Sequence, residues 1–269
     1  MTSRSKRSSL GPARPDLLLK AAKQRNKKTT IVEGVGARFE PVVDGSTLYV
    51  LTNDGAPRGK VVRVDLLQIA KGAPPRASWQ TVIPEGAAVL LRTERLVVRR
   101  FDAGDIETLH TYRNDEGTAA QQGWSTPWPY DDAVMLVAEM ALRDPLFERG
   151  EWAQLAVQRE DDPTLIGDIG VLWQRDDDVA EIGFTLAPEH RGLGYMAEAV
   201  AAVCEEVTRE LGLRLVAAVT RLDHEPARRV LERVGFAAVA LDGDDEVVYA
   251  WRPGGWPGRP EPASDDPAT

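Results

Sequence analysis

The sequence predicts an α+β fold: a mixed, mostly antiparallel sheet flanked by helices and preceded by a small β-rich segment. Three observations predict it. Residues 90–252 alternate between β-rich and helical patterns, and three consecutive β-rich stretches in the middle favour an antiparallel meander. A long amphipathic helix, 196–211, follows a loop with two glycines. Residues 46–83 are β-rich, with turn residues between the stretches.

The bulk composition is that of an ordinary globular chain. Its 269 residues suffice for one large or two small domains. No apolar run approaches the ~20 residues needed to cross a bilayer, and the cluster at 17–19 is too short for a secretory signal. Cys204 has no second cysteine to pair with, and three scattered histidines supply no metal ligand set. We therefore expect a cytoplasmic protein with no metal and no membrane partner.

Charge is distributed unevenly along the chain. Residues 1–30 hold nine Lys or Arg and one acidic residue, although the net charge of the whole chain is −9, so the remainder is strongly acidic. An acidic body repels nucleic acid and is compatible with a basic amine or basic peptide, but the simpler explanation is a soluble surface. The aperiodic stretch 1–35 and the Pro/Gly-rich stretch 253–269 are predicted to be disordered tails.

Residues 36–89 form a separate β-rich segment. Two stretches, 48–51 and 60–64, flank an Asn-Asp-Gly sequence that favours a tight hairpin turn, and a third strand is expected at 79–83. A sheet this small buries too little surface to be stable by itself.

The main domain is expected over 90–252. Gly212 ends its clearest helix, and Asp105 is the expected N-cap of its first one. Helices are predicted at 105–113, 131–142, 196–211 and 226–233, and strands at 95–100, 151–159, 164–174, 179–186, 214–220, 236–241 and 247–251.

The segment with the clearest chemistry is the loop at 191–196, between a predicted strand and the amphipathic helix. Gly192 and Gly194 let the backbone approach a ligand, and the free N–H groups of the helix start add the positive end of the helix dipole. Such a site suits a diphosphate, although a short Gly-x-Gly also occurs in plain loops. The Lys and Ser/Thr of a P-loop are missing, and the preceding strand belongs to a meander rather than to a βαβ unit.

The run RGLGYM at 191–196 resembles the coenzyme A loop of the GNAT superfamily, whose pattern is Gln/Arg-x-x-Gly-x-Gly/Ala. Arg191 and Gly194 match the pattern, and Met196 departs from its last small residue. Together with ARRVLERVGF at 227–236 and the run at 113–133, the chain resembles the RimJ/RimL-type branch over 90–252. The resemblance implies transfer of an acetyl group from acetyl-CoA to a primary amine, either a protein N-terminus or a small molecule.

The resemblance also implies roles for single residues. The strand before the loop is expected to splay from its neighbour at a bulge and to pair with the pantetheine arm. Glu181 matches the general base by position, with a solvent-facing structural glutamate as the alternative, and a backbone N–H near Phe184 or Thr185 is the candidate oxyanion donor. The expected cofactor-binding residues are Phe184, Thr185, Leu186, Arg191, Gly192, Leu193, Gly194, Tyr195, Met196 and His224.

Two positions depart from the family pattern. Leu231 stands where many members have the tyrosine that protonates the departing thiolate, so the general acid is unassigned. His224 replaces the asparagine of an Asn-x-x-Ser motif and either contacts the cofactor or caps a helix. Trp124, Trp128 and Tyr130 are expected to line the amine pocket, or else to serve only in packing. Neither the acceptor nor an oligomeric state follows from these residues.

The run LYVLTNDGAPRGKVVRVDL, followed by SWQTVIPE, resembles part of a blade from the β-propeller of prolyl oligopeptidases, over about 36–90. The sequence contains no Gly-x-Ser-x-Gly nucleophile elbow, so a serine peptidase is not expected, and we interpret the segment as a gene-fusion remnant. The alternative to an acetyltransferase is a protein that binds acyl-CoA without turnover, or an interaction module.

Overall fold

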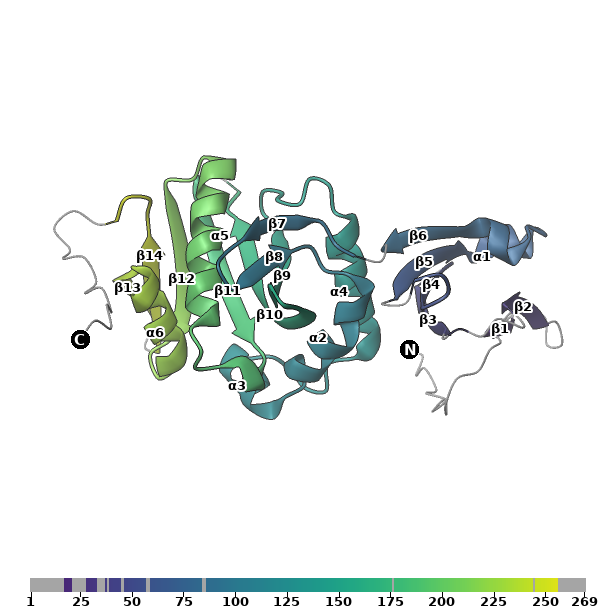
Figure 1. Ribbon diagram of the computed structural model, residues 1–269, viewed down its shortest axis with the longest axis horizontal. Coiled ribbons are helices and arrows are strands. Elements are labelled where there is room, and N and C mark those ends of the chain that lie inside the picture. The colour runs from purple at the N-terminus through teal and green to yellow at the C-terminus, as the bar shows by residue number, and fades with distance from the viewer. Residues whose placement is uncertain are drawn as a thin grey trace. The chain divides into compact units, whose positions relative to one another are not determined.

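The computed structural model describes most of the chain and divides it into two compact units (Figure 1). One unit comprises 1–86, 102–104 and 134–142, and the other 87–101, 105–133 and 143–269. The described residues are 17–20, 28–32, 37, 39–44, 46–56, 59–83, 86–175, 177–243 and 245–255.

The N-terminal unit contains a four-stranded antiparallel sheet of order β3-β4-β5-β6 and a separate two-stranded pair, β1-β2. Alternation along the strands places Leu48, Val50, Val62 and Val64 in one apolar cluster with Phe39. The elements are β1 Leu17–Lys20, β2 Lys28–Val32, β3 Phe39–Asp44, β4 Thr47–Thr52, β5 Lys60–Asp65, α1 Leu66–Ala70, η1 Pro75–Ser78 and β6 Trp79–Ile83.

The small N-terminal β-rich segment is thus confirmed, with differences in detail. Strand β3 was not predicted, and the β4–β5 connection runs from Thr52 to its pairing partner Lys60, which is longer than a tight hairpin turn. Strands β1 and β2 lie inside the stretch predicted to be a disordered tail, so that expectation fails for these nine residues. Composition averaged over 35 residues conceals such short β-rich runs. The rest of the predicted tails lies almost wholly outside the described residues.

The second unit is built on an eight-stranded sheet of order β13-β14-β12-β11-β10-β9-β8-β7. Its strand pairs are antiparallel except for β11 and β12, which confirms the mixed, mostly antiparallel sheet. The edge strand β7 was not predicted. The strands are β7 Val89–Arg92, β8 Leu96–Arg99, β9 Trp152–Arg159, β10 Asp162–Trp173, β11 Val179–Leu186, β12 Leu215–Arg221, β13 Ala237–Asp242 and β14 Glu246–Trp251.

The α-helices follow the predicted order with two additions, the short α1 and α3, and the small and polar residues of α3 give no helical periodicity. Asp105 does not cap α2 through its side chain, because it forms a buried two-point ion pair with Arg99, at 2.6 and 2.8 Å. Among the described residues, no helix is long and apolar enough to cross a membrane. The bounds are η2 Ala103–Asp105, α2 Ile106–Arg113, α3 Glu116–Gln122, α4 Tyr130–Leu142, η3 Pro188–His190, α5 Tyr195–Leu211 and α6 Glu225–Val234.

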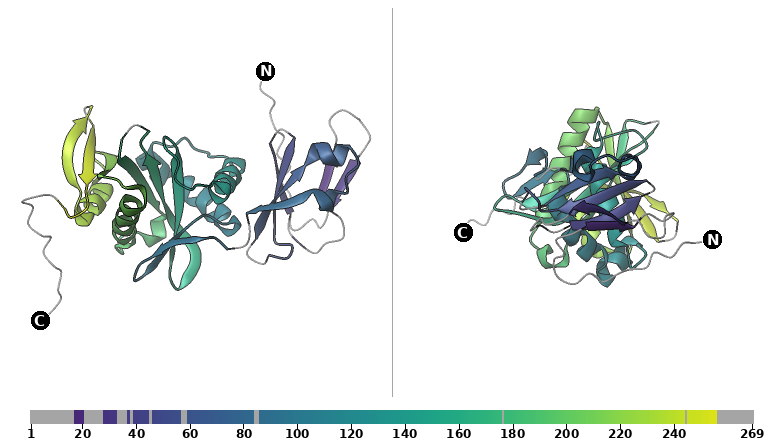
Figure 2. Two further views of the ribbon diagram at one scale, coloured as in Figure 1. Left: turned by 90° about the horizontal axis from the view of Figure 1, so that it is seen from above. Right: turned by 90° about the vertical axis from the view of Figure 1, so that its right-hand side faces the viewer.

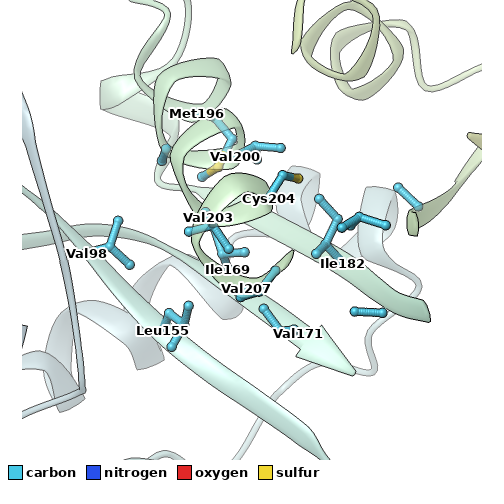
Figure 3. Close-up of a cluster of buried hydrophobic side chains, with 14 of the residues drawn as sticks. Val98, Leu155, Ile169, Val171, Ile182, Met196, Val200, Val203, Cys204 and Val207 are labelled. Carbon is cyan, nitrogen blue, oxygen red and sulfur yellow. The ribbon is translucent and has the colours of Figure 1, made fainter. Parts of the chain in front are cut away.

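Helix α5 covers one face of the eight-stranded sheet (Figure 3). Its apolar positions recur every three or four residues, so they form one stripe that packs on alternate residues of β10 and β11. Cys204 belongs to this stripe, where burial raises the pKa of its thiol and leaves it as a packing residue. The contacting side chains include Met196, Val200, Val203, Val207, Ile169, Val171 and Ile182.

Helices α2 and α3 contact the opposite face of the same sheet. The hydroxyl of Tyr112 in α2 donates a 2.5 Å hydrogen bond to Asp168 of β10, and the amide of Gln122 in α3 lies 3.1 Å from the hydroxyl of Thr185 in β11. The left view of Figure 2 shows helices on both sides of these strands. The two faces of β11 are therefore contacted by different helices, α5 on one side and α3 on the other.

Candidate active site

The site begins where β11 and β12 separate. The two parallel strands pair only from Val179 to Glu181 of β11, although β11 continues beside β10 to Leu186 and β12 continues beside β14 to Arg221. The expected splayed strand is present. The expected bulge is not, because β11 keeps an unbroken register with β10. The divergence of β12 alone opens the strand edge.

The open edge presents the backbone groups of the even-numbered residues of β11. The carbonyl of Val179 accepts from β10, and the N–H of Ala187 donates back to the β10 residue Ile166, both at 2.9 Å, so the odd-numbered positions face β10. The N–H groups of Phe184 and Leu186 therefore point toward the gap. Of the two candidate oxyanion donors, the N–H of Thr185 is turned to β10, which leaves that of Phe184.

Side chains bind two carbonyls of this edge. The amide nitrogen of Gln122 donates to the Phe184 carbonyl, and the Arg191 Nε donates to the Leu186 carbonyl, both at 2.9 Å. Arg191 also donates to the hydroxyl of Thr118 in α3 at 2.7 Å. The arginine of the loop motif thus ties strand, loop and α3 together.

The loop before α5 has the backbone of an anion cradle. Gly192 and Gly194 have φ of 80° and 78°, in the left-handed region that favours glycine. Nothing lies within 4 Å of a Cβ added to Gly192, so its φ rather than crowding requires glycine there. Gly194 is the N-cap of α5, and the first N–H groups of the helix have no acceptor within it. These donors face outward at the positive end of the helix dipole.

Arg95, which sequence reasoning missed, holds this cradle from the turn between β7 and β8. Its guanidinium donates to the Leu193 carbonyl at 3.1 Å, pairs with Glu198 in the first turn of α5 at 2.6 Å, and lies 4.8 Å from the centre of the Tyr195 ring. The two ends of the 3.1 Å bond are 98 residues apart in sequence. No pattern among neighbouring residues could have predicted the contact of Arg95 with Leu193.

A cavity of about 480 Å³ joins the cradle to the open strand edge. Among the described residues, its charged lining side chains are Arg191, Arg229 and Arg233, and no carboxylate lines it. In an otherwise acidic chain, this local excess of cations fits a polyanionic ligand. Of the predicted cofactor-binding residues, Leu193 is outside the lining and 55% exposed. Those in the lining are Phe184, Thr185, Leu186, Arg191, Gly192, Gly194, Tyr195, Met196 and His224.

His224 lies at the cavity, whereas Leu231 lies in the core. His224 is the N-cap residue of α6 by position, as the capping alternative expects, although its side chain makes no capping hydrogen bond; it also lines the cavity. Burial is the main cause that lowers the pKa of His224, so the neutral ring is favoured. Leu231 is buried in the core and brings no proton donor.

Glu181 lies at the last residue of β11 that pairs with β12. Because Ala180 and Ile182 pack under α5, the side chain of Glu181 projects from the opposite face, together with Gly183 and Thr185. It does not line the cavity. The carboxyl is half-buried, and this burial raises its pKa above the ordinary glutamate value, as suits a proton acceptor near neutral pH.

Beside Glu181 the sheet carries a cross-strand glycine pair, Gly170 and Gly183. A Cβ added to Gly183 would meet nothing within 4 Å, so the face is open there. Over Gly170, the amide of Gln154 and the ring of Trp152 lie within 2.8 and 3.1 Å of such a Cβ and form a wall. Open space therefore lies over Gly183, on the sheet face from which the Glu181 side chain projects.

The three aromatic residues predicted to line an amine pocket lie outside this cavity. Trp124 and Trp128 pack against the Arg113 guanidinium, with ring centres 4.6 and 4.9 Å from its Cζ, and Tyr130 contacts His110 edge to face at 5.3 Å. None of the three lines the cavity. In the described part of the chain, no group of three or more His, Cys, Asp or Glu side chains is placed to hold a metal ion.

Two family models match the chain. The acetyltransferase (GNAT) domain matches residues 95–237, and the N-terminal β-propeller domain of prolyl oligopeptidase matches residues 14–158. The shared stretch 95–158 contains β8 and β9, which are inner strands of the eight-stranded sheet. The four-stranded sheet β3–β6 has the strand number of one propeller blade.

Individual relatives agree with the first model. The uncharacterized N-acetyltransferase YoaA of Bacillus subtilis (strain 168) is 30% identical over 150 residues, covering 55% of this chain and 82% of the relative. The spermidine N-acetyltransferase from Vibrio cholerae, solved with CoA and spermine, shares 17% identity at a TM-score of 0.51 over 60% of this chain and 96% of that one. The ribosomal L7/L12 alpha-N-protein acetyltransferase RimL shares 21% identity at a TM-score of 0.50, over 63% of this chain and 98% of that one.

Proposed function

Because this chain belongs to the GNAT family of acetyltransferases, we propose that it transfers the acetyl group of acetyl-CoA to a primary amine, as a relative of the RimJ/RimL-type branch. The observation that carries the proposal is an arginine-lined cavity that connects a glycine cradle to an open strand edge. Coenzyme A combines a diphosphate with an amide-bearing arm. The cradle fits the former and the edge fits the latter.

The residues would share the work as follows. Main-chain N–H groups of 191–196 hold the diphosphate, and the edge at Phe184 and Leu186 pairs with the arm. The amine nitrogen attacks the thioester carbonyl, so an N–C bond forms and the C–S bond breaks. Glu181 accepts the proton that the nitrogen loses, directly or through water, and the Phe184 N–H stabilises the negative oxygen. The thiolate leaves and takes its proton from solvent, since Leu231 offers none.

The acceptor enters from the face opposite α5. That helix packs on its own side of the sheet, whereas the space over Gly183, two residues from Glu181, is open. The relatives named for spermidine and for a ribosomal protein N-terminus act on amines, and an amine acceptor of either kind suits an acidic chain. We place the reaction in the cytoplasm, where a lone buried thiol such as Cys204 is common.

The proposal is tested by the release of free coenzyme A from acetyl-CoA in the presence of spermidine, lysine esters and short peptides with free N-termini. We expect release that depends on at least one of these amines. Release no faster than without an amine, combined with thermal stabilisation of the protein by acetyl-CoA, would identify a binding protein instead. Leu231 at the position of the usual proton donor is the feature that favours this second candidate.

Replacement of Gly183 by Ala tests the acceptor side. Since no atom lies within 4 Å of the new methyl group and the φ of Gly183 is ordinary, the variant should fold. We expect kcat/KM for the amine to fall about tenfold, because the methyl group occupies the open space through which the amine is proposed to approach, while the KM for acetyl-CoA stays unchanged.

The matched control is Gly117→Ala, which adds the same methyl group in α3 at an ordinary 3.5 Å contact with Asp115. Equal kinetics for the Gly183 variant and the wild type would contradict the proposed approach of the amine. A larger substitution, Gly183→Val, should deepen the loss.

A further inference from the structure

Helix α6 presents two arginines to the cavity at a spacing of one helical turn. Arg229 and Arg233 both line the cavity, and positions four apart lie on the same helix face, about 6 Å apart along the axis. Pro226 and Val230 share this face and complete the wall. The helix thus carries a short ladder of two positive charges along one side of the proposed cofactor site.

The two arginines stand in different relations to the cradle. The Arg233 guanidinium lies 4.0 Å from a Cβ added to Gly194, so it is beside the loop that would hold the diphosphate. Arg229 is one turn nearer the start of α6 and pairs at 2.5 Å with Glu225. The side chains of both Arg229 and Glu225 are largely exposed, with 72% and 66% of their surface accessible.

An exposed ion pair of this kind is easily exchanged. It contributes only about 0–1 kcal/mol to stability, because water competes for both partners. A phosphate group accepts two parallel hydrogen bonds from one guanidinium and carries more charge than a carboxylate. Arg229 should therefore exchange Glu225 for a phosphate that arrives within its reach.

Coenzyme A carries phosphate in two places: the diphosphate bridge and a monophosphate on the 3′ oxygen of its ribose. We propose that Arg233 serves the diphosphate and that Arg229 forms a separate subsite for the 3′-phosphate, with Glu225 as its resting partner. The assignment rests on the proposed use of acetyl-CoA. It makes Arg229 the residue that distinguishes coenzyme A from dephospho-coenzyme A, which lacks only that monophosphate.

Isothermal titration of the full chain with coenzyme A and with dephospho-coenzyme A tests the subsite without any turnover. The wild type should bind coenzyme A about tenfold more tightly, as expected for one charge-assisted contact. Arg229→Gln should remove this preference by lowering the affinity for coenzyme A alone. Arg233→Gln should lower the affinity for both ligands. Glu225→Gln should raise the affinity for coenzyme A alone, since it frees Arg229. A purely structural role of the Arg229–Glu225 pair would not raise this affinity.

The control is Arg209→Gln, which removes an exposed charge from α5, outside the cavity, and should leave both affinities near those of the wild type. Equal wild-type affinity for the two ligands, or an Arg229 variant that lowers both affinities alike, would overturn the proposed subsite. Either result would leave the proposed acetyltransferase activity intact. Failure of the wild type to bind either ligand would overturn both.

Discussion

The Glu181→Gln variant is expected to lose about 10²- to 10⁴-fold in turnover with the amine near neutral pH, the range that a positioned general base contributes. The change removes the proton acceptor and keeps the size of the side chain. Because Glu181 lies on the face opposite α5 and outside the cavity lining, the KM for acetyl-CoA should be nearly unchanged. Steady-state kinetics with the best amine of the panel measure both quantities.

The pH profile separates a base from a merely structural glutamate. Burial raises the pKa of Glu181 in the folded protein, so its proton-accepting form is lost earlier than in an exposed glutamate as the pH falls. The wild type should lose activity through this pKa on the acid side, and the deficit of the variant should shrink there. Glu210→Gln, an exposed change of the same charge on α5, is the control. Parallel pH–activity profiles for the wild type and the Glu181 variant would exclude Glu181 as the general base.

The Gly194→Val variant is expected to weaken coenzyme A binding by about 100-fold or more, because it disrupts several charge-assisted main-chain hydrogen bonds at once. Gly194 has a φ of 78°, which a β-branched residue avoids, so the loop must rearrange. An added Cβ would also lie 3.5 Å from the Arg95 guanidinium that holds the loop. Titration with coenzyme A measures the affinity directly.

The two ends of α5 supply the matched control. Gly212 caps the C-terminus of the same helix with a φ of 66°, and nothing lies within 4 Å of an added Cβ. Gly212→Val should therefore cost a comparable amount of stability, about 1–2 kcal/mol from the left-handed backbone, and spare the cradle. Two variants with similar melting temperatures and similar coenzyme A affinities would show that the loop does not hold the cofactor.

Local patterns were sufficient for much of the fold. Strand 179–186 was predicted with its observed bounds, and the helix after it to within one residue, because periodicity and terminal glycines are properties of adjacent residues. Strand β7 and helix α3 were missed, since each is short and α3 lacks an apolar stripe. Pairing with a neighbour, rather than propensity, stabilises elements of this length.

The sequence by itself determined the glycine-containing turn at 191–196 and its place between a strand and a helix, because the backbone conformation of this loop depends on glycines within it. Only the tertiary structure decided what surrounds it: Arg95 against Leu193, Gln122 on the Phe184 carbonyl, and Gly170 opposite Gly183. These contacts arise from strand register and helix packing between segments far apart in the chain. Their geometry is set by the burial of the whole core, which no short stretch of residues encodes.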